Sequence, residues 1–323
     1  MRIRAILQAR FAVTALLLIL VVSNSGNGAR AQDCNACRAG QSLSAASTES
    51  WTVRKRVNEV QVLFTAKRHG RFVTGLTESD ISVLDNKTPA VVVAFRGQEN
   101  LPLRIVLLID TSNSIRNRFF FEKQAALVFL RQTLRSERDQ AMVAGFNSRL
   151  RVVQGFSHDL RQLSDEIAGL RSSGATAMFD AVSQACGLLA QSGQGMVARV
   201  LIVVSDGDDN ASRMSLRDAA ESADGAQVTI YAIGTNYQSD DIASQDNLRY
   251  LSRATGGRAL FPETAREVRH DFARISEDLR HRYAVAYRPP ELARDGSFHR
   301  IRVQARHWGK NLKVRARQGY YAR

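Results

Sequence analysis

The chain has 323 residues, of which 44% are hydrophobic, 24% charged and 7% aromatic. This composition excludes a disordered or fibrous chain, and the length suffices for one large core or two smaller ones. The chain is strongly basic, with 45 Lys and Arg against 31 Asp and Glu. An anionic cell surface, made of phospholipid or acidic polysaccharide, is therefore a possible contact.

Residues 1–31 are predicted to be an export signal. Three arginines precede an apolar run over residues 11–22, and Ala29-Arg30-Ala31 is a small-x-small cleavage site. An uncleaved membrane anchor is the alternative, although a membrane-spanning helix needs about 20 apolar residues. Cleavage would remove four arginines and no acid, lowering the net charge from +14 to +10. We expect a periplasmic or extracellular protein and no nucleic-acid partner, since no nucleic-acid-binding motif is present.

Residues 32–50 are predicted to be a flexible lead-in. Cys34 and Cys37 lie in this Gly-, Ser- and Ala-rich stretch, without the strand and helix that frame a redox CxxC. A local disulfide is therefore expected there, whereas Cys186 falls in an apolar helical pattern and is expected in a core. Residues 51–101 then alternate between apolar and polar, as in Val60 to Thr65, and predict antiparallel strands.

Residues 102–280 have a different pattern. The run from Arg104 to Ile109 is almost wholly apolar, which is typical of a strand buried on both faces in a parallel sheet. Helical and strand patterns alternate after it, up to a long helix from Ala265 to Arg280. This alternation predicts an α/β fold with a doubly wound, mainly parallel sheet.

Residues 281–323 return to strand periodicity. Ile301, Val303, Leu312 and Val314 are predicted to form one face of the strands, and arginines and lysines the other. Because the segments 51–101 and 281–323 are each too small to bury a core, we expect them to combine. The predicted product is a small β-sandwich into which the α/β domain is inserted.

Oxygen-bearing side chains follow the buried strands of the α/β segment. Asp110, Ser112 and Ser114 form a D-x-S-x-S sequence after the first strand, Thr176 precedes a helix, and Asp206 follows a later strand. Ligands of such sheets bind at the carboxyl ends of the strands, so these residues are expected to lie together. Hard oxygen donors suit Mg²⁺, Mn²⁺ or Ca²⁺.

These five residues resemble the metal-ion-dependent adhesion site of the von Willebrand factor type A (VWA) family. The resemblance implies that Ser112 and Ser114 ligate the ion directly, Thr176 directly or through water, and Asp110 and Asp206 mostly through water. It also implies a metal-dependent module that binds a protein partner through an Asp or Glu carboxylate. More broadly, the order of segments resembles exported bacterial VWA-related proteins.

Two other functions are alternatives to this one. A Mg²⁺-dependent phosphohydrolase of the haloacid dehalogenase type uses D-x-D, but Ser112 occupies the position of its general acid/base. A metal-free structural scaffold is the second alternative. No other catalytic motif is present, so no catalytic residue is predicted and the protein is not expected to be an enzyme.

Overall fold

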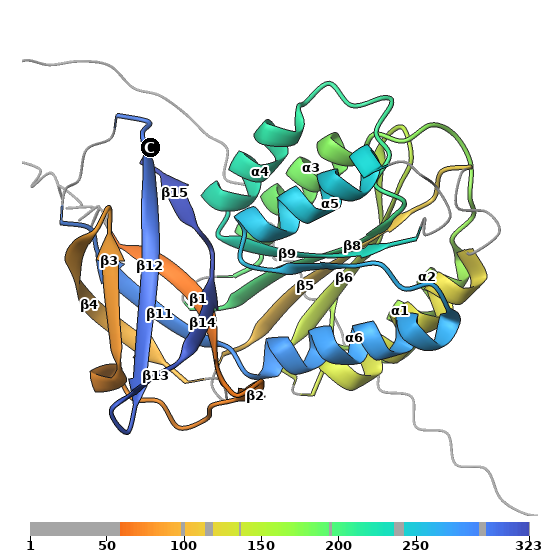
Figure 1. The fold of residues 1–323 in the computed structure, drawn as a ribbon. Helices are drawn as coiled ribbons and strands as arrows, with labels where there is room; N and C mark the ends of the chain where they lie inside the picture. Colours follow the sequence, from red (N-terminus) through yellow and green to blue (C-terminus); the bar gives the residue numbers. More distant parts are fainter. Residues whose placement is uncertain are drawn as a thin grey trace, which may run out of the picture. The chain divides into compact units, whose positions relative to one another are not determined.

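The computed structural model describes residues 59–97, 101–113, 119–135, 137–193, 196–235, 242–290 and 295–322. The predicted signal, the lead-in and the Cys34–Cys37 disulfide lie outside these residues. These residues belong to one compact unit, which contains a six-stranded and a nine-stranded sheet (Figure 1). No helix in the described ranges is long and apolar enough to cross a membrane.

The six-stranded sheet has the order β10-β9-β8-β5-β6-β7. Its central strands have both faces buried, as their apolar sequences predict, and Cys186 is buried beside them. Only the edge strand β7 runs antiparallel to its neighbour. The strands are β5 (Leu103–Asp110), β6 (Gln140–Phe146), β7 (Leu150–Ser157), β8 (Ala198–Ser205), β9 (Val228–Gly234) and β10 (Arg258–Leu260).

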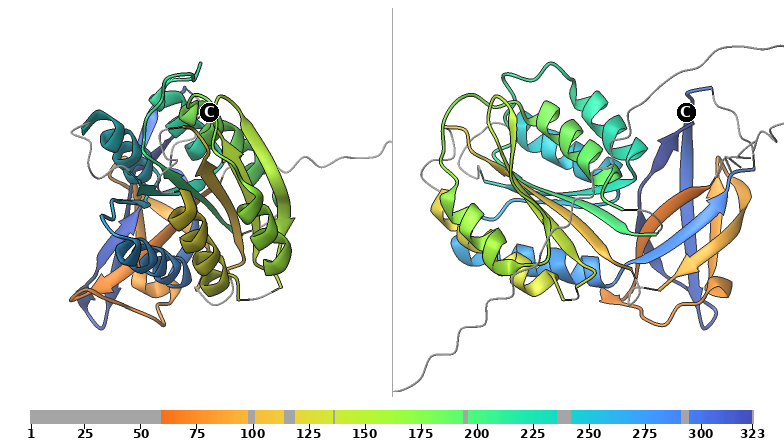
Figure 2. Two further views of the ribbon diagram at one scale, coloured as in Figure 1. Left: turned by 90° about the vertical axis from the view of Figure 1, so that its right-hand side faces the viewer. Right: turned by 180° about the vertical axis from the view of Figure 1, so that it is seen from behind.

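Helices cover both faces of this sheet, which confirms the predicted doubly wound fold (Figure 2). Side chains from α1, α2 and α6 pack on one face, and side chains from α3, α4 and α5 on the other. Asp159, Ser215 and Thr264 begin three of the helices by accepting backbone N–H bonds. The helices are α1 (Phe119–Thr133), α2 (Leu160–Gly169), α3 (Met178–Ala190), α4 (Leu216–Gly225), α5 (Ile242–Ala254) and α6 (Ala265–Arg280).

The nine-stranded sheet joins the two ends of the described chain. β1 lies between β11 and β14, β4 pairs with β11, and β3 pairs with β12, all antiparallel. These pairings confirm the predicted β-sandwich-like module, a curled sheet around one apolar core. Its elements are β1 (Val60–Arg68), β2 (Arg71–Phe72), η1 (Glu78–Asp80), β3 (Ile81–Asp85), β4 (Thr88–Arg96), β11 (Tyr283–Arg288), β12 (Phe298–His307), β13 (Lys310–Asn311), β14 (Lys313–Ala316) and β15 (Gly319–Tyr321).

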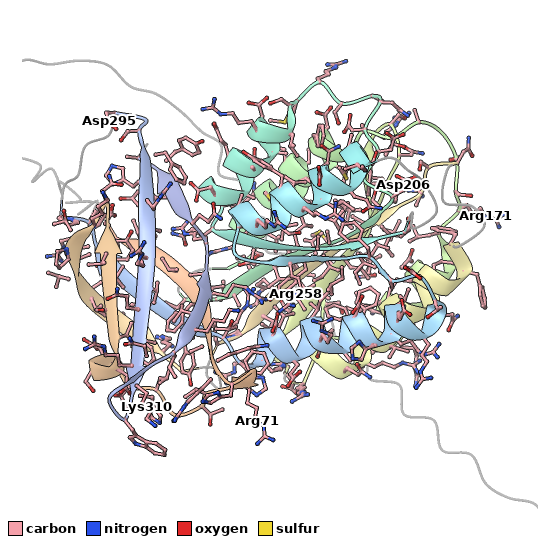
Figure 3. All side chains as sticks on the ribbon, viewed as in Figure 1. Arg71, Arg171, Asp206, Arg258, Asp295 and Lys310 are labelled. Carbon is pink, nitrogen blue, oxygen red and sulfur yellow. The ribbon has the colours of Figure 1, made fainter. Side chains whose placement is uncertain are left out.

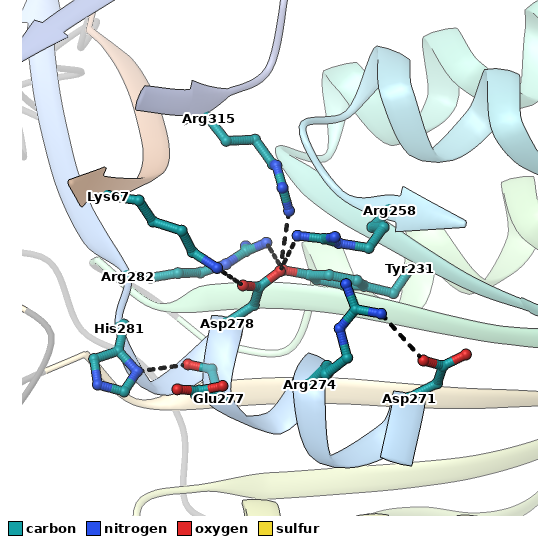
Figure 4. A network of polar contacts seen from close by, with 10 residues as sticks. All are labelled: Lys67, Tyr231, Arg258, Asp271, Arg274, Glu277, Asp278, His281, Arg282 and Arg315. Carbon is teal, nitrogen blue, oxygen red and sulfur yellow. Dashed lines mark hydrogen bonds and ion pairs between the residues drawn. The ribbon is translucent and has the colours of Figure 1, made fainter. Parts of the chain in front are cut away.

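The cations of the last strands, predicted to share one face, have different roles. Arg315 donates to Asp278 of α6 at 3.0 Å, and Lys67 and Arg258 lie 3.5 Å from the same carboxylate (Figure 4). Arg317 donates to Asp224 of α4 at 2.7 Å. Arg315 on β14 and Arg317 after it therefore join the antiparallel sheet to helices of the α/β fold.

A second buried carboxylate, Asp139, holds three elements of the α/β fold together. It accepts the backbone N–H of Leu103 at the start of β5 and that of Arg135 after α1, and it receives Arg280 of α6 at 2.7 Å. Burial acts to raise the pKa of Asp139, but Arg280 and the two N–H groups outweigh burial and lower it.

We predict that Asp139→Asn destabilises the protein by about 3 kcal/mol, because a buried ion pair loses its charge and Arg280 loses its partner. The change in urea-unfolding midpoint measures this. Because folding lowers the pKa of Asp139, its charged form stabilises the fold above the usual carboxylate range. That contribution is lost as the pH falls through the pKa of the folded state, so the difference in unfolding free energy between the variant and wild type should shrink in acid. Asp246→Asn removes an exposed pair with Arg249 and should cost less than about 1 kcal/mol. Equal costs would contradict the proposed role of Asp139.

Candidate functional site

Two carboxylates follow neighbouring parallel strands at one rim of the six-stranded sheet. β5 and β8 pair in register, with Ile109 opposite Val204, so Asp110 at the end of β5 lies near the residues that follow β8. Asp206 follows Val204 by two positions, directly after the end of β8. The side chain labelled Asp206 in Figure 3 marks this rim. The parallel pairing therefore brings together two acids that are 96 positions apart.

Asp110 is completely buried and fixed by hydrogen bonds. One carboxylate oxygen accepts the backbone N–H of Ser112 at 2.8 Å, and the other accepts the Ser205 hydroxyl at 2.7 Å. Burial raises its pKa to about 6 despite these bonds, and repulsion from Asp206 adds to the shift. The two carboxylates are thus close enough to interact in a site poorly exposed to water.

Neither carboxylate is neutralised by a cation within the described ranges. Asp206 is 6% exposed, and its Oδ1 accepts the backbone N–H of Asp208 at 3.1 Å. The ion pairs formed between described residues include neither Asp110 nor Asp206. Buried carboxylates are normally paired or bound to a metal, so this rim has negative charge to offer a cation.

A third loop brings Thr176 to the same rim. The backbone N–H of Asn113 donates to the carbonyl of Gly174, which joins the loop after β5 to the loop before α3. The carbonyl of Thr176 accepts the N–H groups of Asn210 and Ala211, while its own N–H donates to Asn210 Oδ1 at 3.0 Å. These hydrogen bonds connect the three loops into one site. Ser112 and Thr176 are both buried in it.

Four of the five predicted residues are therefore placed at this rim: Asp110, Ser112, Thr176 and Asp206. Ser114 lies outside the described residues. Asp209 lies in the loop after β8, and its Oδ2 accepts the N–H of Phe179 in the first turn of α3 at 2.8 Å. An acid facing a helix N-terminus is a favourable arrangement, yet the sequence did not reveal which helix Asp209 would meet.

The residue after Asp206 must be glycine. Gly207 has φ +89°, and a Cβ atom there would lie 2.2 Å from the backbone oxygen of Ser244 in α5. Any side chain would therefore push the loop away from α5 and displace the neighbouring carboxylate. The D-G pair after β8 thus has a steric cause in this fold.

The donor set fits a hard cation. Among the described residues, no three His, Cys, Asp or Glu side chains gather as a metal cluster, so an ion at this rim would rely on hydroxyl oxygens besides two carboxylates. Oxygen-only sites suit Mg²⁺, Mn²⁺ and Ca²⁺ rather than softer metals. Asp110 and Asp206 both carry negative charge, and a bound cation would neutralise it.

The family model of the von Willebrand factor type A domain matches residues 105–270, just over half of the chain. The chain belongs to this family. The VWA domain comprises β5 to the first part of α6, including the rim. No curated protein sequence shows significant similarity to the chain.

Solved structures are similar to this chain at low sequence identity. A von Willebrand factor type A protein from Catenulispora acidiphila is 13% identical with a TM-score of 0.51, over 80% of this chain and 75% of its own. The vWF domain of the type V pili tip protein Mfa5 from Porphyromonas gingivalis is 12% identical with a TM-score of 0.46, over 55% of this chain and 94% of its own. The similarity to the Catenulispora acidiphila protein establishes the fold alone.

We predict that Gly207→Ala weakens folding by at least about 2 kcal/mol, since it adds a clash and a strained backbone. Gly187 is an exposed helical glycine in α3 with nothing within 4 Å of its Cβ position. Gly187→Ala should instead stabilise the protein by up to about 1 kcal/mol. Thermal unfolding of both variants tests the pair, and a neutral Gly207→Ala would contradict the close contact with α5.

Proposed function

We propose that this protein is an exported, metal-dependent protein-binding module. The observation that supports this most is the pair of buried carboxylates, Asp110 and Asp206, without a described cationic partner beside the hydroxyl residues Ser112 and Thr176. With Ser114 they form the ligand set that the family resemblance implies. Mg²⁺ is the proposed ion, with Mn²⁺ or Ca²⁺ as alternatives.

The charge balance at the rim explains how such an ion would serve binding. Two carboxylates against a divalent cation leave no excess negative charge, and the hydroxyl ligands are neutral. The ion therefore keeps an affinity for one more anionic oxygen, which a partner's Asp or Glu side chain can supply. This chain's residues hold the ion and orient its open position, and the partner completes the site.

A binding role is also favoured over catalysis. VWA domains are generally interaction modules, and a phosphohydrolase would need an acid where Ser112 stands. The proposed location is outside the cytoplasm, in the periplasm or beyond the cell, because of the predicted signal over residues 1–31.

Metal binding should raise the unfolding temperature of residues 32–323 by mass action. We predict a rise of several degrees with millimolar Mg²⁺ or Mn²⁺ and none for Asp110→Ala, which removes a carboxylate from the site. Asp165→Asn, an exposed acid on α2, should keep the full rise. No rise in the wild-type protein would contradict the metal site and favour a metal-free scaffold.

The metal-induced rise should also depend on pH. The pKa of Asp110, raised to about 6, means that this group favours folding below its unfolded pKa and loses that contribution as pH rises through 6. A cation would offset the cost of the charged form, so its effect should be largest above pH 6 and shrink below it. Calorimetric titration of Mg²⁺ across this range tests the prediction, and a pH-independent affinity would contradict it.

A further inference from the structure

The exposed side of β12 carries a row of arginines. Ile301, Val303 and Ala305 point into the core of the nine-stranded sheet, and side chains alternate along a strand. Arg300, Arg302 and Arg306 therefore lie on the opposite side, where the strand is exposed at each of these positions. Residues two apart on one strand face are about 7 Å from each other.

Apolar side chains stand beside these arginines on the neighbouring strands. The register places Arg302 opposite Leu84 of β3 and Leu84 opposite Pro89 of β4. Val91 and Val93 continue this outward side of β4 and are 67% and 36% exposed. Strands β12, β3 and β4 are adjacent in Figure 1. We call Arg300, Arg302, Arg306, Leu84, Val91 and Val93 the basic face.

The charge of the basic face is not compensated within the described ranges. The outward positions of β3, β4 and β12 include no Asp or Glu. The side chains of Arg300 and Arg302 form no hydrogen bond or ion pair with a described residue, and Arg306 donates to Asn311 Oδ1 at 2.9 Å. Arg315 and Arg317 differ because each is held by an acid of the α/β fold. No acid among the described residues thus pairs with the arginines on β12, and their positive charge is available to a partner.

The hairpin at the end of β12 adds an exposed aromatic ring. Trp308 is 84% exposed and stacks on His307 with a centroid distance of 4.6 Å. Lys310 follows in β13, is exposed, and is labelled at this end of the sheet in Figure 3. Tryptophan beside basic residues is typical of side chains that lie at a membrane–water interface.

We propose that the basic face docks on a lipid bilayer that contains anionic phospholipid. The positive charges of the arginines and of Lys310 are complementary to the negative surface of such a bilayer. The exposed valines and Trp308 distinguish this partner from a soluble polyanion, because apolar side chains gain by entering the boundary between headgroups and acyl chains. The basic face shares no residue with the rim that carries Asp110.

Vesicle sedimentation tests this proposal on residues 32–323, which omit the apolar run 11–22 from every protein compared. We expect binding to vesicles of phosphatidylcholine mixed with phosphatidylglycerol, little binding to phosphatidylcholine alone, and weaker binding at high salt. Arg300→Glu with Arg302→Glu should lower the partition coefficient at least ~10-fold, and Val91→Ser roughly threefold. Binding should persist in EDTA, which separates it from the metal-dependent function.

The matched control is Arg151→Glu with Arg161→Glu, an equal charge change at exposed positions on β7 and α2. It should retain most of the binding, and thermal unfolding should show that both double variants are folded. Equal losses in both would mean that net charge, not the basic face, drives binding. Binding to dextran sulfate without binding to vesicles would replace the bilayer by a soluble polyanion, and no binding to either would overturn the proposal.

Discussion

The parallel pairing of β5 with β8 is the constraint on which the rest of the structure depends. Both strands are buried on both faces, so their backbone groups must be satisfied by neighbouring strands and their side chains by helices on each side. At its start, β5 is held by Asp139 through the backbone N–H of Leu103. At its end, β5 delivers Asp110 to the rim. One strand therefore connects the stability of the fold to the geometry of the candidate site.

Charge is distributed unevenly in this molecule, and each part has a different consequence. Asp278 and Asp224 form ion pairs with Arg315 and Arg317, and these pairs hold the antiparallel sheet against α6 and α4. Asp110 and Asp206 have no cationic partner among the described residues, so their negative charge favours the binding of a cation. The arginines of β12 have no acidic partner among the described residues, so their positive charge favours an anionic partner. The proposed metal ion would neutralise the first charge and the proposed bilayer the second, at separate surfaces.

A buried cluster in the antiparallel sheet shows how polar groups can instead satisfy one another. Asp85 accepts the hydroxyls of Tyr287 and Tyr320 at 2.9 and 3.0 Å, and its other oxygen lies 2.8 Å from His299 Nδ1. These residues come from β3, β11, β12 and β15, so the network ties the C-terminal strands to the N-terminal segment. Because its polar atoms already bind each other, this cluster offers less to a ligand than the rim does.

The sequence by itself determined the fold class. The apolar run before Asp110 predicted a strand buried on both faces, and the alternation after it predicted helices on both sides of a parallel sheet. The order Asp110, Ser112, Thr176 and Asp206 predicted one rim, because parallel strands carry their carboxyl ends to a common edge. Periodicity of two before and after the α/β segment predicted strands, and their small size predicted that they combine.

Only the tertiary structure decided which charges meet. Arg302 and Arg315 look alike in the sequence, since both alternate with apolar residues in a basic strand. Arg315 faces Asp278, whereas Arg302 faces outward beside Leu84, and this depends on the curl of the sheet and on where α6 packs. Likewise, Asp139 and Arg280 are 141 positions apart. Long-range partners follow from how elements pack, and local patterns of hydrophobicity carry no information about that packing.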